Sequence, residues 1–339
     1  MSSGMQFGLF DWIDRAPVDT SQLYEQRLKL VELADKAGFY GYHLAEHHGT
    51  TLNMAPSPAV FFSALAQRTK NIRFSAMAFL LPMYHPIRLI EEVCMLDHLS
   101  NGRVEVGISR GVSPYEMKCF GVNPESSKEI FNEVLEIFQR GMTGSSLDYA
   151  GKYFQFENVP IPLSPLQTPH PPLWYPTFSE SGTNYAAKNG FNFLTLGPSA
   201  LAARLASLYR KTANQSESES VKQFEATKIG AMRQVFLADT DDQALKIAEP
   251  AYRDWFQSIT ELWHRNNDSS FDDFFAWESC LANETILIGS TGTVREKIQQ
   301  LVEESGINYF VGSFAWGSLS FDQSRESLSR FASEVIPTI

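Results

Sequence analysis

Residues 72–108, IRFSAMAFLLPMYHPIRLIEEVCMLDHLSNGRVEVGI, hold a complete strand, helix and strand. The run 72–81 is apolar without alternation, which is typical of a strand buried on both faces of a parallel sheet. Pro86 then opens a helix that ends at 100–102, and 103–108 forms the next strand. Two parallel strands joined by a helix are the unit of α/β folds, so this stretch predicts an α/β protein.

The same unit repeats along the chain. Strand starts near residues 5, 40, 72 and 103 give a spacing of roughly 32 to 35 residues, the size of one strand-helix unit. Four more strands are predicted at 173–176, 191–196, 228–238 and 308–314. Eight strands alternating with helices close into a (β/α)8 TIM barrel. The competing doubly wound sheet usually carries a glycine-rich loop after its first strand, and DWIDRAPVD at 11–19 is not one.

Two stretches interrupt this repeat. Residues 144–172 predict a short hairpin and a proline-rich loop after the fourth strand, and residues 262–284 predict an insertion after the seventh. We expect residues 1–339 to form a single barrel domain with these two insertions. The aromatic side chains between Phe271 and Trp277 form either a cover over the barrel or a surface that packs on outer helices or a second subunit, and both readings stay open.

Composition excludes several classes of partner. The net charge is -11 and the pI is near 5.2, so we expect no nucleic-acid or membrane partner, because anionic surfaces repel such a chain. The sequence shows neither a signal-peptide pattern nor a run of about 18 apolar residues. Cys94, Cys119 and Cys280 are widely spaced, which predicts neither a disulfide framework nor a thiolate metal site. We therefore expect a cytoplasmic protein.

The segment HLAEHHG, at 43–49, places Glu46, His47 and His48 at the end of the second strand, where barrel enzymes carry catalytic groups. Adjacent histidines on an extended stretch point to opposite sides, so they cannot readily share one metal ion, and we expect no metal site. Imidazoles at the mouth of an apolar barrel suit proton transfer or hydrogen bonding to an intermediate. The alternative is that these histidines only form hydrogen bonds with buried backbone groups.

Ser109, Arg110 and Gly111 follow the fourth strand, which again places them at the barrel mouth. The guanidinium of Arg110 offers a fork of donors for a phosphate, and a glycine allows the backbone to approach closely. An anionic cofactor is therefore one reading. The other is an ion pair between Arg110 and a barrel carboxylate such as Glu46.

A second candidate anion site follows the fifth strand. Ser179, Ser181 and Gly182 begin a helix there, where free amide donors and the helix dipole favour an anion. Helix capping alone explains the same residues equally well. Two candidate anion sites on separate strand ends support each other.

Several segments, taken together, resemble the bacterial luciferase-like flavin-dependent monooxygenases. They are AEHHG (45–49), the run 77–111 (MAFLLPMYHPIRLIEEVCMLDHLSNGRVEVGISRG), FGVNPESSKEIF (120–131), HPPLWYPTFSESGTNYAAKNG (170–190) and LIGSTGTVREKIQQLVEESGINYFVGSFAWG (287–317). The resemblance covers nearly the whole chain in order. It implies a (β/α)8 barrel in a two-component system, in which a separate flavin reductase supplies reduced FMN. Reduced FMN and O2 then give a C4a-hydroperoxide that oxygenates a small organic substrate such as an aldehyde or another carbonyl compound.

The resemblance also implies roles for individual residues. His47 resembles the catalytic histidine, Glu46 would support it, and Ser109 stands where the catalytic chain of luciferase has a reactive cysteine. The residues implied to bind the flavin are Met77 and Ala78 on the isoalloxazine, often with a cis peptide, Arg110 and Lys128 on the phosphate, and Ser179, Ser181 and Gly182 in a phosphate loop. Ser109, together with Gly197 in place of a tryptophan, departs from luciferase in positions that concern light emission and a long-chain aldehyde substrate, not flavin binding.

The resemblance implies a homodimer as well, with helices beside the early strands in the interface and Cys94 near it. Two rival functions remain. One is a protein that binds flavin without turnover, and the other is hydride transfer with the deazaflavin F420. Relatives that use F420 generally lack the Glu-His-His motif, so the sequence favours FMN.

Overall fold

A closed parallel barrel forms the centre of the molecule. The computed structural model describes residues 4–215 and 227–339. Its main sheet has nine strands, of which β10 stays outside the ring and the other eight close it, because β9 pairs with both β8 and β11. In ring order the eight are β1 (Gln6–Asp11), β2 (Gly41–Leu44), β3 (Arg73–Leu80), β4 (Val104–Ser109), β7 (Leu173–Pro176), β8 (Asn192–Thr195), β9 (Ile229–Leu237) and β11 (Tyr309–Ser313), which pairs with β1. The prediction of a (β/α)8 barrel is confirmed.

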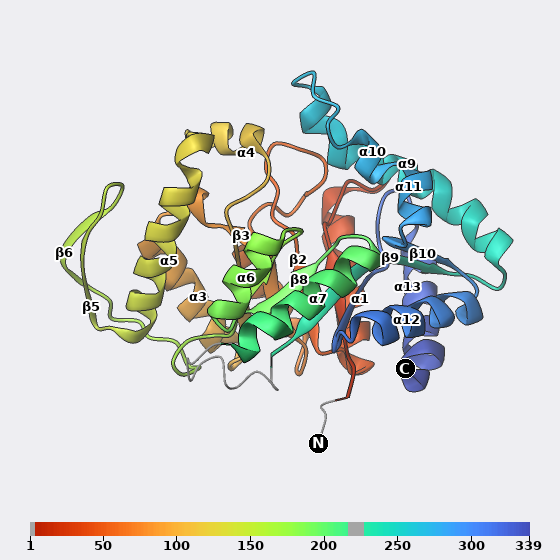
Figure 1. Cartoon of the computed structure of the whole chain (residues 1–339), viewed down its shortest axis with the longest axis horizontal. Helices are drawn as coiled ribbons and strands as arrows, with labels where there is room; N and C mark the ends of the chain where they lie inside the picture. Colours follow the sequence, from red (N-terminus) through yellow and green to blue (C-terminus); the bar gives the residue numbers. More distant parts are fainter. Residues whose placement is uncertain (1–3, 216–226) are drawn as a thin grey trace.

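Helices surround the ring (Figure 1). They are α1 (Thr20–Lys36), α2 (Pro58–Arg68), α3 (Pro86–Ser100), α5 (Ser127–Thr143), α6 (Glu180–Lys188), α7 (Ser199–Asn214), α9 (Asp241–His264), α12 (Thr291–Ser305) and α13 (Phe321–Arg330). Strand β3 is buried at every position after Arg73, as its unbroken apolar run predicts. Its outer side chains pack on helices, and the rings of Phe74 and Phe62 of α2 lie 5.0 Å apart. Apolar burial of this kind supplies most of the driving force for folding.

Local signals set the ends of α3. Pro86 occupies the first turn, where its missing amide hydrogen costs nothing. The helix ends at Asn101, which has a left-handed φ of 56°, followed by Gly102 with a φ of 79°. Both residue types tolerate this conformation, so the chain turns directly into β4.

Both predicted interruptions of the repeat are present, but one strand was missed. Residues 144–172 include an antiparallel hairpin of β5 (Ser146–Ala150) and β6 (Gln155–Pro160), which extends away from α5 (Figure 1). The second interruption holds two short helices, α10 (Asp272–Phe275) and α11 (Trp277–Ala282), while α9 continues to His264. The unpredicted strand is β10 (Ile286–Gly289), which, among the described residues, pairs only with residues 234–237 at the carboxyl end of β9.

Side chains fill the interior of the barrel near the amino ends of its strands. The hydroxyl of Tyr309 and Nε2 of His43 lie 2.7 Å apart, and both rings contact Trp174. Burial, helped by the charge of Lys228, lowers the pKa of His43 to about 3, so this imidazole is neutral. His43 therefore belongs to the packed interior of the barrel, together with Tyr309 and Trp174. In the described ranges, no helix is both long and apolar enough to cross a bilayer.

A buried charge cluster supports the loop that follows β1. Arg27 of α1 lies 3.5 Å from Asp11 and 3.6 Å from Asp14, and Oδ2 of Asp14 accepts a hydrogen bond from the amide of Gly317 at 2.7 Å. One cation thus faces two buried carboxylates. Burial raises the pKa of Asp14 from 3.8 to about 7, although Arg27 and the Gly317 amide both oppose that rise.

We expect this carboxyl to make stability decrease with pH. Because folded Asp14 holds its proton more tightly than the unfolded chain does, its contribution is complete below pH 3.8 and is lost as the pH rises to about 7. Asp14→Asn should remove the contribution of this carboxyl to the fall in the free energy of unfolding between pH 3.8 and about 7. Urea unfolding at several pH values in this range measures the fall. The exposed Asp19→Asn is the control. An unchanged slope in Asp14→Asn would contradict the assignment.

Candidate active site

The sequence-predicted site residues lie at the end of the barrel formed by the carboxyl ends of the strands. In Figure 1 the short helices α4 (Pro114–Cys119) and α10 lie at this end, and the N-terminus lies at the opposite one. The Glu-His-His stretch follows β2 directly. Barrel enzymes carry their reactive groups at this end, so the geometry here decides the function.

His47 is held by a carboxylate from another loop. Its Nδ1 lies 3.0 Å from Oε1 of Glu116, while the backbone amide of His48 donates to the other oxygen of Glu116 at 2.9 Å. Ser113 caps α4 by accepting from the amide of Glu116, which fixes that carboxylate at the helix start. With Nδ1 engaged, Nε2 of His47 is the ring nitrogen left for chemistry.

Glu46 makes no hydrogen bond to His47, so the supporting role that the resemblance implies would act through its charge. Its carboxylate accepts from Nε2 of His48 at 2.9 Å and from the hydroxyl of Tyr84 at 2.8 Å, and Glu46 is only 2% exposed. The two histidines therefore face different carboxylates. Within residues 4–215 and 227–339, no group of three or more His, Cys, Asp or Glu side chains is placed to hold a metal ion.

The charge of Glu116 controls the proton affinity of His47. Burial alone lowers the pKa of His47, but attraction to Glu116 and the hydrogen bond to it outweigh burial, so the pKa is raised. Glu46 adds to this rise through its charge, without contact. The side chain stays 22% exposed, so it can exchange protons with solvent or with a ligand. This arrangement suits a group that accepts and donates a proton.

We expect Glu116→Gln to lower the pKa of His47, because an amide keeps the shape of the carboxylate and removes its charge. The chemical shifts of the labelled imidazoles, followed against pH, measure this change. The pKa of His47 should fall, and Glu116→Asp should restore part of it. If the pKa of His47 is the same in Glu116→Gln and the wild type, Glu116 does not play this role.

Met77 and Ala78 are joined by a cis peptide bond that involves no proline. The register between β3 and β4 shifts between Ala76 and Phe79, so an irregularity interrupts the strand at these two residues. Met77 is 7% exposed and belongs to the apolar cluster that includes Phe10 and Trp12. Met77 and Ala78 therefore form an apolar surface at the barrel mouth, which is named the Met77–Ala78 ledge.

Arg110 is exposed and makes no hydrogen bond or ion pair with any residue the structure describes. Its predicted alternative partner, Glu46, is engaged by His48 and Tyr84, so that ion pair is absent. Burial raises the pKa of Tyr175, near the end of β7, and the charge of Arg110 opposes that rise. Ser109 accepts from the amide of Gly111 at 3.1 Å, and the φ of Gly111 is 86°.

The loop after β7 matches the predicted anion site in geometry. Ser179 caps α6 by accepting from the amide of Gly182 at 3.1 Å, and the hydroxyls of Ser179 and Ser181 lie 3.2 Å apart. A Cβ on Gly182 would lie 2.2 Å from Oγ1 of Thr177, so close packing requires the glycine. The first amides of α6 have no partner within the helix.

Lys128 lies on the exposed surface of α5 near its first residue. Phe131, one turn later but buried, contacts Tyr175 of β7 and Tyr185 of α6. Lys128 is therefore one helical turn from a residue that packs on both β7 and α6. Free cations and amide donors of this kind fit a phosphate group, and the Met77–Ala78 ledge fits a flat apolar ring, so the residues present fit FMN.

The C-terminal half of α9 is joined to the loop that follows the histidines. Thr51 donates through Oγ1 to Glu261 at 2.6 Å, and Thr50 donates to the backbone oxygen of Ser258 at 3.0 Å. A second donor from Thr51, its backbone amide, also reaches Glu261 at 2.8 Å. These bonds fix α9 beside the site.

The segment that follows α9, residues 265–276, is named the crossing segment. Asp268 accepts from the hydroxyl of Tyr115 at 2.8 Å, and the ring of Phe274 lies 6.0 Å from that of Phe178. The crossing segment therefore contacts the loops after both β4 and β7. Phe271 and Phe275 instead pack on tryptophans of α9, as the reading of these aromatics as a surface on an outer helix predicts for these two.

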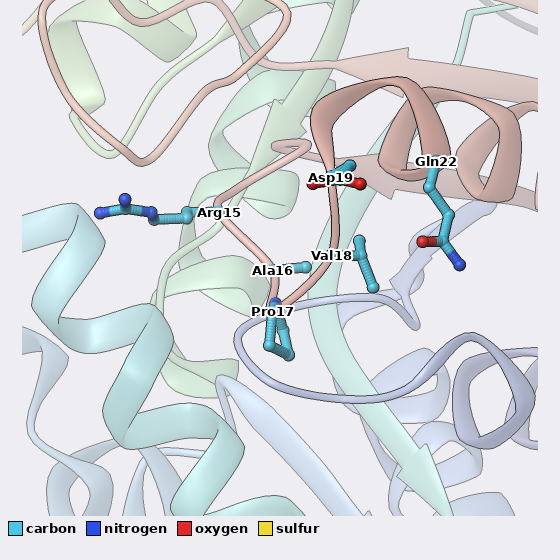
Figure 2. A pocket seen from close by; sticks show the side chains of 6 residues that line it. All are labelled: Arg15, Ala16, Pro17, Val18, Asp19 and Gln22. Atoms are coloured by element: carbon cyan, nitrogen blue, oxygen red, sulfur yellow. The ribbon is translucent and has the colours of Figure 1, made fainter.

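A surface hollow of about 570 Å³ lies in the loop after β1 (Figure 2). It is lined by Arg15, Ala16, Pro17, Val18, Asp19 and Gln22. None of the predicted site residues is among them. The hollow is therefore a separate surface feature and not the candidate active site.

One functional residue escaped sequence reasoning. Glu116 holds His47 but was not singled out, although the pattern Ser113-x-x-Glu116 after the fourth strand is a helix-start signal at a barrel mouth. The signal marks a carboxylate fixed at the correct end of the barrel. It does not reveal which side chain the carboxylate contacts.

Comparison with known proteins identifies the family. The profile of the luciferase-like monooxygenases matches residues 5–309. The oxygenase component of the flavin-dependent trigonelline monooxygenase of Acinetobacter baylyi is 26% identical over 355 residues, covering 98% of this chain and 95% of that protein. The structure of monooxygenase RslO1 from Streptomyces bottropensis has a TM-score of 0.86 at 24% identity, covering 98% of this chain and 99% of that one.

The oxygenating constituent of the 3,6-diketocamphane monooxygenase of Pseudomonas putida, solved with FMN, has a TM-score of 0.82 at 23% identity and covers 99% of both chains. Neighbours that use F420 are more distant, at 16% identity. The fold and its relatives define an oxidoreductase built on a parallel α/β barrel. The chain belongs to the luciferase-like monooxygenase family.

Proposed function

We propose that this chain is the oxygenase component of a two-component monooxygenase that uses reduced FMN and O2 to oxygenate a small organic substrate. The observation that carries the proposal is the pairing of His47 with Glu116 at the same rim as Arg110, which has no partner among residues 4–215 and 227–339. A proton-transfer group and an anion-binding group thus share one barrel mouth. That combination fits catalysis better than storage of a flavin.

Reduced FMN, when bound, supplies the electrons that activate O2, and one oxygen atom enters the substrate. Arg110 and the start of α6 would hold its phosphate, with Lys128 adding charge. Met77 and Ala78 would support the isoalloxazine ring. His47 would hold or move a proton through Nε2, while Glu116 fixes its orientation and raises its pKa.

Exclusion of water is the second requirement, because reactive oxygen species are lost to solvent in an open site. The contacts of Asp268 with Tyr115 and of Phe274 with Phe178 support a covering role for the crossing segment. Ser109 lies at the same rim, with its hydroxyl bonded to the loop backbone. We assign it to the site wall.

Two partners follow from the proposal. A separate flavin reductase would supply reduced FMN, since the relatives include an oxygenase component. A homodimer is supported by exposed apolar side chains on the adjacent helices α2 and α3: Val60, Met95 and Leu99 are 71%, 55% and 50% exposed. Patches of this kind often mark interfaces.

Anaerobic titration of the protein with reduced FMN, followed by mixing with aerated buffer, tests the proposal. We expect reduced FMN to bind and oxidised flavin to reappear more slowly than from free FMN. Immediate reappearance would point to a protein that holds flavin without turnover. Binding of reduced F420 in place of reduced FMN would support hydride transfer, the second rival.

A further inference from the structure

Two polar side chains inside the barrel lack partners. Gln234 of β9 and Ser313 of β11 are 4% and 0% exposed. The amide nitrogen of the first and the hydroxyl of the second make no hydrogen bond within the described parts of the chain. Native proteins seldom leave buried polar groups unpaired, so each such group needs an explanation.

Both side chains point toward the barrel axis. Tyr309 does so, because its hydroxyl reaches His43 inside the ring, and strand alternation places Ser313, four residues later, on the same side. On β9, a Cβ at Gly230 would meet the side chains of Leu194 and Tyr309, so Gly230 faces inward and Gln234 does too. Ser313 and Gln234 are direct partners in the register of the two strands.

The pair lies near the mouth of the barrel. Ser313 is the last residue of β11. Phe10, Met77 and Met232 belong to one buried apolar cluster, and Met232, two residues before Gln234 on β9, faces the same side of the strand as Gln234 does. Strands β3 and β9 are third and seventh in a ring of eight, so Gln234 lies across the barrel from the Met77–Ala78 ledge. Apolar walls with a few convergent polar groups are typical of small-molecule sites.

We propose that Gln234 and Ser313 bind an oxygen atom of the substrate, which is therefore a neutral molecule with a carbonyl or hydroxyl oxygen on an apolar frame. The amide and the hydroxyl both donate, so a single oxygen accepts from both. The neighbouring cation, Arg233, faces the other side of β9, where it donates to Ser199, so it offers no charge to an ionised substrate. This inference rests on the proposed function.

The test is calorimetric binding to the FMN-loaded protein. The probes are cyclohexanone, camphor and 2-decanone, each compared with its parent hydrocarbon. We expect at least one ketone to bind more tightly than its hydrocarbon, and Gln234→Met and Ser313→Ala each to weaken that ketone by about tenfold, close to the loss of one hydrogen bond. Hydrocarbon binding should not change.

A matched control is Ser324 of α13, which lies outside the ring and is also buried, with a hydroxyl that has no partner among the residues the structure describes. Ser324→Ala should bind every probe as the wild type does. Equal affinity for ketones and hydrocarbons in the wild type would overturn the proposal. So would variants that weaken reduced FMN instead of the ketone, because the pair would then contact the flavin. Failure of the wild type to bind reduced FMN would refute the proposed function separately.

Discussion

Replacement of His47 by alanine is expected to abolish the delay between mixing with O2 and the reappearance of oxidised FMN, while reduced FMN still binds. The free Nε2 of His47 is the proton-transfer atom of the proposed site, and Glu116 fixes the ring through Nδ1. A positioned acid-base group contributes about 10²- to 10⁴-fold to a rate. We therefore expect product formation to fall by a factor in that range, with hydrogen peroxide formed instead.

The alanine variant leaves Glu116 without its partner, and Glu116 is 4% exposed. In His47→Gln, Glu116 keeps a partner, because the glutamine amide still donates a hydrogen bond to the carboxylate but does not titrate. Both variants should behave alike. His98→Ala, which changes an exposed histidine of α3, is the control. Wild-type kinetics in His47→Gln would show that the site needs only a hydrogen-bond donor at this position.

Replacement of Arg110 by alanine is expected to weaken FMN binding by roughly 10- to 150-fold, the range for loss of a hydrogen bond to a charged group. Arg110 is exposed and has no protein partner in the described residues, so it needs no internal bond to break before it binds a phosphate. Arg110→Lys should give an intermediate affinity, because lysine keeps the charge but loses the two-pronged geometry. Equilibrium titration of flavin fluorescence measures each constant.

Riboflavin, which lacks the phosphate, makes this prediction specific. The wild type should bind FMN more tightly than riboflavin, and Arg110→Ala should remove most of that difference while leaving riboflavin affinity unchanged. Arg88→Ala removes another exposed arginine, one paired with Glu92 on α3, and should have no effect. An equal loss of affinity for both flavins would place Arg110 against the ring system instead of the phosphate.

The sequence predicts the barrel well because the relevant signals are local. Unbroken apolar runs mark buried parallel strands, and Pro86 and Gly102 mark the ends of α3. Strand β10 escaped prediction for a physical reason: three apolar residues and a glycine fit a short strand and a helix turn equally well. Its pairing with residues 234–237 of β9 depends on where distant segments meet.

The site was predictable in its members but less so in its contacts. The resemblance implies that Glu46 supports His47, and alternation along an extended chain places Glu46 and His48 on one side and His47 on the other, so Glu46 acts on His47 by charge and not by a hydrogen bond. The hydrogen-bond partner of His47, Glu116, is 69 residues away along the sequence. A hydrogen bond between two loops depends on how the whole barrel positions them, and no local pattern encodes it.

The bond between Tyr115 and Asp268 has a practical consequence for protein engineering. Tyr115 precedes Glu116 directly, so one peptide unit separates the residue that contacts the crossing segment from the residue that holds His47. A designer who alters Tyr115 to admit bulkier compounds will also disturb the imidazole. Phe274 contacts Phe178 without a link of this kind, so we expect a change at Phe274 to leave the contact between Glu116 and His47 in place.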